Sequence, residues 1–183
     1  GIGVVSPIGN DKQSFWDSLN SGCGGISTIT RFDTSDYPVH IAGESKDFDP
    51  LKYLERRDAR HMDRFTLFAM GAGIQAVEDS GIDFDKCDRD RIGVIVGSGI
   101  GGMEVYEKQL HKLFNRGPRK VSPFFIPMLI SDIAAGQLSI RYGLRGPNYA
   151  TTSACATSSH SIGCAMKSIR YGDADLVLTG GAE

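Results

Sequence analysis

The chain has 183 residues, of which 40% are hydrophobic and 23% charged, and its formal net charge at pH 7 is -2. This composition is typical of a globular domain with one sizeable core, and it lacks the basic excess that nucleic-acid binding uses. The apolar runs are short, and the first residues lack the basic start and long apolar region of a secretory signal. We therefore expect no membrane span, no nucleic-acid partner and a cytoplasmic location.

The four cysteines are spread along the chain without a C-x-x-C pair. They are Cys23, Cys87, Cys155 and Cys164. This spacing favours neither a zinc site nor a disulfide scaffold, so we expect reduced thiols and no metal.

Helices in the first half of the chain are predicted from their end signals. Asp11 is a suitable N-cap for a short helix. Asp49 followed by Pro50 is typical of a second helix start. Residues 64–80 have apolar side chains at helical spacing and are followed by Gly81, which predicts a long and largely buried helix.

Strands are predicted where β-branched residues cluster. Residues 92–97, "IGVIVG", form a run without polar alternation, which indicates a strand covered on both faces of a parallel or mixed sheet. Residues 144–154 and 173–181 are predicted as further strands, residues 39–44 are compatible with one, and the first residues read as the tail of another. Their alternation with helices predicts an α/β fold.

Three more helices are predicted in the second half. They are expected over residues 103–114, over residues 126–142 up to Gly143, and from near Cys155 to residue 171. The chain opens without methionine and stops just after a predicted strand. We therefore expect it to be a piece of a longer polypeptide.

The stretch "GSGIGG" at residues 97–102 satisfies G-x-G-x-x-G between a predicted strand and a predicted helix. A dinucleotide site also needs a second strand with an acidic residue about twenty positions on. That distance falls in the basic segment "RGPRK". We therefore interpret these glycines as a sharp turn that allows close approach of the backbone.

Cys155 lies in "TTSACATSSHSIG", residues 151–163, at the start of a predicted helix with no charged residue before Lys167. A helix without a charged face is usually buried on all sides. The free N–H groups and positive dipole of a helix N-terminus would stabilise a thiolate and an oxyanion there. The residues alone leave open whether Cys155 is a nucleophile or a small buried side chain. His160, five positions on, points elsewhere and is expected to be a packed or hydrogen-bonded core histidine.

Several motifs together resemble one enzyme family. "TTSACATSSHSIG" and "GDADLVLTGGAE" resemble the active-site segment of the elongating β-ketoacyl-acyl-carrier-protein synthases of fatty acid synthesis, with the type II enzymes favoured over type I. "GSGIGG", "GPRKVSPFFIP" and "YGLRGPN" fit the same family in the same order. The resemblance implies a thiolase-like fold of five layers, α, β, α, β, α, of which residues 1–183 form roughly the N-terminal half.

The resemblance also implies the reaction. Cys155 would take an acyl group from the phosphopantetheine thioester of acyl carrier protein. Decarboxylation of malonyl-acyl carrier protein would then give a carbanion that attacks the acyl-cysteine. No cofactor is implied beyond the phosphopantetheine that carries the substrates. The family's two histidines and lysine lie further along the polypeptide, so we expect residues 1–183 alone to be inactive in condensation.

The remaining site residues are likewise implied by the resemblance. The Cys155 N–H would be one oxyanion donor, Ile100 would wall the acyl pocket, and Phe125 would reach the partner's pocket in a homodimer. The basic residues expected to meet the acidic carrier protein are Arg57, Arg60, Arg119 and Lys120. The sequence departs from the family at His61, where a lysine or arginine is common. In a eukaryotic source, a plastid would be the alternative location.

Two alternative functions keep the same fold. One is a ketosynthase domain of a polyketide synthase, which shares the motif and the chemistry. The other is a non-catalytic subunit resembling a chain-length factor. Such subunits commonly replace the cysteine, so the presence of Cys155 argues against this second alternative.

Overall fold

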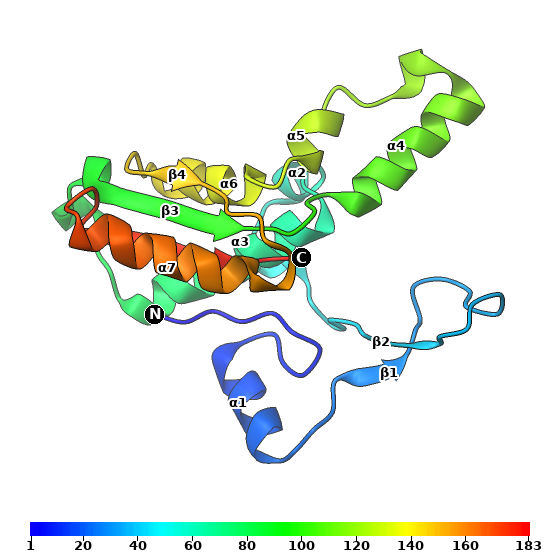
Figure 1. Cartoon of the computed structure of the whole chain (residues 1–183), viewed down its shortest axis with the longest axis horizontal. Helices are drawn as coiled ribbons and strands as arrows, with labels where there is room; N and C mark the ends of the chain where they lie inside the picture. The colour runs from blue at the N-terminus through cyan, green and yellow to red at the C-terminus, as the bar shows by residue number, and fades with distance from the viewer.

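A three-stranded parallel sheet forms the centre of the computed structural model, which describes all residues from 1 to 183. The strands are β3 (Ile92–Gly97), β4 (Asn148–Tyr149) and β5 (Leu176–Gly181), in the order β4-β3-β5. β3 pairs with β5 along its whole length (Figure 1). The parallel α/β arrangement predicted from the sequence is therefore confirmed.

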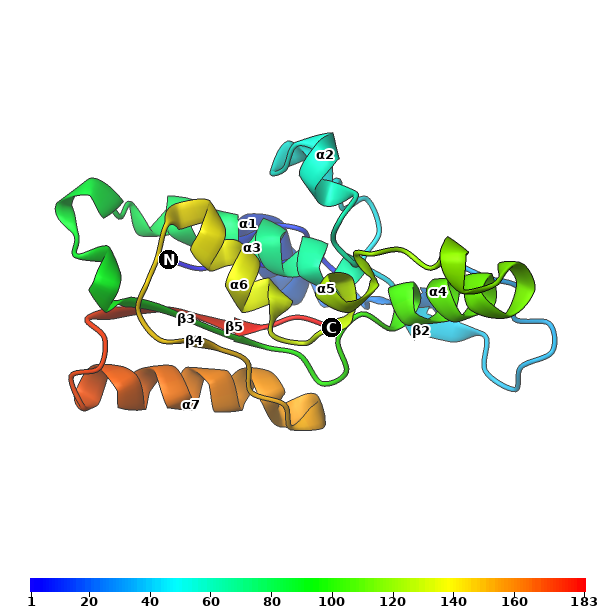
Figure 2. The same cartoon turned by 90° about the horizontal axis from the view of Figure 1, so that it is seen from above.

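Helices cover both faces of this sheet. α3 (Arg64–Ser80) and α6 (Ile133–Tyr142) lie on one face, and α7 (Thr157–Arg170) lies on the other (Figure 2). Every residue of β3 is buried, as expected for a central strand covered twice. The main core is formed by side chains of β3, α3 and α6 and of the segments beside them. Its largest members include Phe65, Met70, Ile74, Ile92, Val94 and Leu138.

Both ends of α3 follow local rules. The Asp63 side chain accepts a hydrogen bond from the Arg64 N–H and so caps the N-terminus. Gly81 ends the helix with a φ of 65°, a left-handed conformation that costs glycine little. The predicted boundaries of this helix are confirmed.

The remaining elements extend from the sheet as an arm and a set of short helices (Figure 1). α1 (Lys12–Asn20) is capped by Asp11, as predicted. The arm is the antiparallel pair β1 (Ile26–Thr28) and β2 (Ile41–Gly43). The other helices are α2 (Arg56–Ala59), α4 (Met103–Arg116) and α5 (Phe125–Leu129), with 3-10 turns at Pro50–Lys52, Phe84–Lys86, Arg89–Arg91, Pro118–Lys120 and Ala154–Ala156.

Four predicted elements differ from the structure. The helix expected to start after Asp49 is only the 3-10 turn Pro50–Lys52. The first five residues form no strand. The single helix expected over residues 126–142 is broken into α5 and α6, because Ile130 adopts an extended conformation with ψ 139°. The strand expected over residues 144–154 is reduced to the two residues of β4. The local pattern was right about the type of these last two elements but wrong about their length.

The prediction that α7 is buried on all sides is wrong for this chain. Its small residues Thr157, Ser161 and Ala165 face the sheet and are buried, whereas Ile162 and Met166 are 54% and 46% exposed. Only one sheet packs against this helix, so its larger apolar side chains face outward. None of the helices in the structure combines the length and the apolar character that crossing a membrane would require.

Candidate active site

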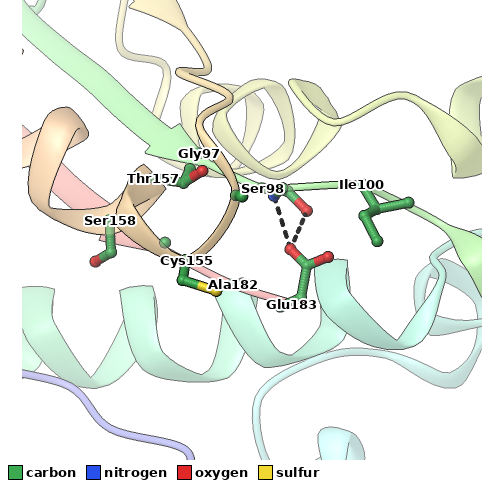
Figure 3. Close-up of a pocket in the computed structure, with 11 residues that line it drawn as sticks. Gly97, Ser98, Ile100, Cys155, Thr157, Ser158, Ala182 and Glu183 are labelled. Carbon is green, nitrogen blue, oxygen red and sulfur yellow. Dashed lines mark hydrogen bonds between the residues drawn. The ribbon is translucent and has the colours of Figure 1, made fainter.

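A cavity of about 510 Å³ opens at the carboxyl ends of β3 and β5 (Figure 3). One wall is the glycine turn, defined here as residues 97–102, which continues β3. A second wall is the segment before and into α7, and a third is the end of β5 with Ala182 and Glu183. The volume lies within the range of pockets that bind small molecules, and this edge of a parallel sheet is where such pockets usually form.

Cys155 lines this cavity, and its side chain is exposed. It lies in the 3-10 turn Ala154–Ala156, one turn before α7 begins. Ala154 has a φ of 50°, which is unusual for a residue with a side chain and costs about 1 kcal/mol or more. The turn places the thiol at the cavity. Because its backbone conformation is unfavourable, contacts with surrounding residues must stabilise it.

Hydroxyl groups supply those contacts. Thr157 Oγ1 accepts a 2.8 Å hydrogen bond from the Ser153 N–H. Thr151 Oγ1 donates to the Thr157 carbonyl at 3.0 Å and lies 2.8 Å from Ser161 Oγ. Thr157 and Ser161 are 5% and 0% exposed, so water does not compete with these bonds. The polar residues of "TTSACATSSHSIG" thus anchor the turn to the buried face of α7.

The N-terminus of α7 points its dipole toward this turn. No side chain caps α7, since its N-cap residue is Ala156. Uncapped N–H groups and the positive end of a helix favour a negative charge nearby. The arrangement therefore favours an oxyanion on the oxygen of a carbonyl group that the Cys155 sulfur attacks.

Gly97 allows β3 to approach α7 this closely. A Cβ at this position would lie 2.6 Å from the Thr151 carbonyl oxygen and would also overlap the Thr157 methyl group. The sequence predicted close approach of the backbone at the glycine turn, and this position shows it. At Gly97, β3 approaches the cysteine segment, defined here as residues 151–157. No nucleotide is needed to explain the glycine.

The carboxylate of Glu183 holds the glycine turn from the end of β5. It accepts hydrogen bonds from Ser98 Oγ at 3.0 Å and from the Gly99 N–H at 2.7 Å (Figure 3). Neither Glu183 nor Ser98 was predicted from the sequence as a site residue. The available signal was that both follow strands predicted to be parallel, whose carboxyl ends meet at one edge of the sheet.

The residue expected to wall the acyl pocket lies in this cavity. Ile100 lines it with Cys155 and is 63% exposed. Phe125 does not line it, and its ring lies 6.2 Å from the ring of Tyr106. The structure contains one chain, so the expected role of Phe125 toward a partner subunit stays a prediction.

The four basic residues expected at a carrier-protein surface are all exposed. Arg57 belongs to α2, Arg60 follows it, and Arg119 and Lys120 lie in the 3-10 turn after α4. The His61 and Phe124 rings stack at 4.1 Å and so join the two segments that carry these residues. Arg57 also lies 3.2 Å from the Asp58 carboxylate.

His160 was expected in the core, and this prediction is wrong. The helix face that carries it points away from the sheet, and the residue is exposed. Its Nδ1 lies 2.6 Å from Ser153 Oγ, so the expected hydrogen bonding is present. The cavity lining contains no histidine and no lysine, and its titratable groups are Cys155 and Glu183. No group of three or more His, Cys, Asp or Glu side chains is placed to hold a metal ion.

Comparison with known proteins gives consistent relatives. A 3-oxoacyl-acyl-carrier-protein synthase 2 from Staphylococcus aureus is 51% identical over 183 residues, which are 100% of this chain and 45% of that protein. A protein of the same name from Vibrio cholerae is 49% identical, with 44% of its length covered. The chain thus spans less than half the length of these curated relatives.

Solved structures show the same fold. The ishigamide ketosynthase/chain length factor matches with a TM-score of 0.90 and 27% identity, over 100% of this chain and 46% of that chain. A type II PKS acyl-carrier protein in complex with its ketosynthase matches with a TM-score of 0.84 and 26% identity, over 99% of this chain and 48% of that chain. These likenesses confirm the thiolase-like α/β fold. The family described as "Beta-ketoacyl synthase, N-terminal domain" matches residues 1–183, and the chain therefore belongs to the β-ketoacyl synthase family.

Proposed function

We propose that the polypeptide carrying this chain is a β-ketoacyl-acyl-carrier-protein synthase of fatty acid elongation, with Cys155 as the acyl acceptor. The observation that carries the proposal is the position of Cys155 on a cavity of about 510 Å³, directly before the uncapped N-terminus of α7. The 51% identity to a 3-oxoacyl-acyl-carrier-protein synthase 2 supports it.

In the first half-reaction, the Cys155 sulfur attacks the thioester carbonyl of an acyl-phosphopantetheine. A bond forms between the Cys155 sulfur and the acyl carbon, and the bond to the pantetheine sulfur breaks. The pantetheine leaves as a thiol with the proton that Cys155 gives up. The N–H groups at the start of α7 stabilise the oxyanion that forms in between.

In the second half-reaction, malonyl-acyl carrier protein loses carbon dioxide. The electron pair of the broken carbon–carbon bond attacks the acyl carbon on Cys155. The bond to the Cys155 sulfur then breaks, and the sulfur takes up one proton from water, which restores the thiol. The cavity lining in this chain offers no histidine or lysine to assist this step, so residues 1–183 alone are expected to take an acyl group but not to condense it.

The partner of this site is acyl carrier protein, an acidic molecule in the proposed family. The exposed residues Arg57, Arg60, Arg119 and Lys120 would steer it toward the cavity. The structural likeness to a ketosynthase in complex with a type II PKS acyl-carrier protein supports this part of the proposal. We further propose a cytoplasmic homodimer in which Phe125 reaches the partner's pocket, with no metal and no bound cofactor.

A ketosynthase of polyketide synthesis is the second candidate. It is favoured by the likeness to the ishigamide ketosynthase/chain length factor, although the identity there is 27%. A product analysis distinguishes the two pathways. Saturated-chain acyl substrates condensed once per reduction cycle support fatty acid elongation, whereas repeated condensation without reduction supports polyketide synthesis.

The test is the intact mass of the complete encoded polypeptide after mixing with a medium-chain acyl-acyl carrier protein. We expect a gain of one acyl group in the parent and in Cys23→Ala, which removes another exposed thiol. We expect no gain in Cys155→Ala. An acyl gain that persists in folded Cys155→Ala, or none in the folded parent, would contradict the proposal.

A further inference from the structure

One carboxylate oxygen fixes the glycine turn at the cavity. Glu183 Oε2 accepts both the Ser98 hydroxyl at 3.0 Å and the Gly99 N–H at 2.7 Å (Figure 3). Ser98 Oγ in turn accepts a 3.0 Å hydrogen bond from the Gly101 N–H. Ser98 is 1% exposed, so its hydroxyl has these partners in place of water. The three bonds form a connected network that starts at Glu183.

This network holds the residues on both sides of Ile100 in the sequence. Gly99 and Gly101 flank Ile100 and are both held by the network, whereas Ile100 makes no backbone hydrogen bond of its own. Gly101 has a φ of 87°, which glycine adopts readily, so the backbone beside Ile100 is intrinsically free to change conformation. The position of the Ile100 side chain in the cavity therefore depends on what holds the glycines on either side of it.

We propose that Glu183 is a positioning residue that latches the glycine turn and thereby sets which acyl chain lengths Cys155 accepts. The inference rests on the proposed function, because it assigns Ile100 to the wall of an acyl pocket. Glu183 acts through Ile100 and takes no part in bond making. This latch, the pair of hydrogen bonds from Ser98 and Gly99 to Glu183, joins the end of β5 to the end of β3, which form two walls of the cavity.

The chemistry of the latch predicts how substitutions behave. Hydrogen bonds to an ionised carboxylate are about twice as strong as neutral ones. Both donors use the same oxygen, so the amide oxygen of a glutamine can accept from both, and Glu183→Gln should keep the turn in place. Glu183→Ala offers no acceptor, so the turn and Ile100 become mobile.

The test measures acylation of the complete encoded polypeptide by medium-chain and by long-chain acyl-acyl carrier protein, as two rates from intact mass. We expect Glu183→Ala to change the ratio of the two rates by about fivefold or more, and Glu183→Gln by less than about twofold. Asp175→Ala removes the carboxylate at the other end of β5, where it pairs with Arg91 on the surface, and should leave the ratio unchanged.

A double-mutant cycle shows whether Glu183 acts through Ile100. In an Ile100→Ala background, Glu183→Ala should cause no further change in the ratio, because the side chain that the latch positions is gone. If Glu183→Ala does not fold, Ser98→Ala removes the hydroxyl that connects Glu183 to Gly101 and should shift the ratio in the same direction. The thermal unfolding midpoint of each variant identifies those that fold.

The outcomes separate this inference from the proposed function. A parent that takes no acyl group overturns the proposed function and the latch with it. A parent that is acylated, with a Glu183→Ala variant that keeps the parent's ratio, overturns the latch alone. The same holds if Glu183→Ala changes the ratio equally with and without Ile100.

Discussion

The buried Asp63 carboxylate accepts a 2.7 Å hydrogen bond from the backbone N–H of Val105, in the first turn of α4. Its other oxygen accepts the Arg64 N–H at the start of α3. Asp63 is 6% exposed, so one buried charge compensates the N-terminal dipoles of two helices. The two helices are thereby fixed to each other beside the glycine turn.

Replacing Asp63 should destabilise the fold more than replacing an ordinary helix cap. We expect Asp63→Ala to lower the free energy of unfolding by about 2 to 4 kcal/mol, because two helix N–H groups lose a charged acceptor. Asp11→Ala removes the cap of the exposed helix α1 and should cost about 1 kcal/mol. Urea unfolding measures both, and equal losses would contradict the bridging role of Asp63.

Gly97→Ala should disrupt the site because its Cβ would overlap Thr157 and the Thr151 carbonyl. We expect a loss of at least about 2 kcal/mol in the free energy of unfolding, as in overpacked cores. Gly163, in the interior of α7, has open space around its Cβ direction. Gly163→Ala should therefore stabilise the protein by about 0.5 to 1 kcal/mol. Stabilisation by Gly97→Ala would show that β3 and the cysteine segment are further apart.

Substitutions at Ala154 should affect Cys155 through the backbone. At a φ of 50°, a β-branched side chain is strongly disfavoured, whereas glycine is not. We expect Ala154→Val to slow alkylation of Cys155 by iodoacetamide several-fold and to destabilise the protein by about 1 to 2 kcal/mol. Ala154→Gly should keep the parent's stability and alkylation rate to within about twofold. Equal behaviour of the two variants would argue against the left-handed conformation.

Glu104 should contribute stability that depends on pH. The hydrogen bond from Lys108, opposed by partial burial and supported by a 2.6 Å bond from Arg31, lowers the pKa of the Glu104 carboxyl from its ordinary value of 4.5. Because the folded pKa lies below the unfolded one, the contribution is fully present above about pH 4.5 and is lost as the pH falls through the folded pKa.

We expect Glu104→Gln to lower the free energy of unfolding by about 0.5 to 1 kcal/mol at neutral pH, the size of a partly exposed ion pair. The difference from the parent should shrink as the pH falls below the ordinary carboxyl range. Glu107→Gln, on the exposed side of the same helix and outside the ion pairs, is the control and should change little at either pH. If the stability difference between Glu104→Gln and the parent grows as the pH falls, the predicted lowering of the Glu104 pKa is wrong.

The elements predicted best from the sequence are those with strong local signals. β3 is a run of β-branched residues, and α3 combines a capping aspartate with a terminal glycine. Such signals act over a few residues and need no knowledge of the rest of the chain. The position of Cys155 before a helix N-terminus was predictable for the same reason.

Other features depend on contacts between distant segments. The break at Ile130 and the shortness of β4 had no signal in the local pattern of the sequence. The hydrogen bond between Ser98 and Glu183 joins residues 85 positions apart, so no local pattern contains it. Ile100 was assigned to the pocket through a family resemblance, and the structure places it in the same cavity as Cys155.

The long-range pairing of β3 with β5 has a consequence for synthesis. Arg91, beside the start of β3, bonds Asp175, beside the start of β5, across 84 positions of sequence. A ribosome delivers β3 long before its partner strand, and non-local pairings of this kind form slowly. During that interval Cys155 has no cavity, because the end of β5 supplies one of the walls. The cavity beside Cys155 is therefore complete only after β5 has paired with β3.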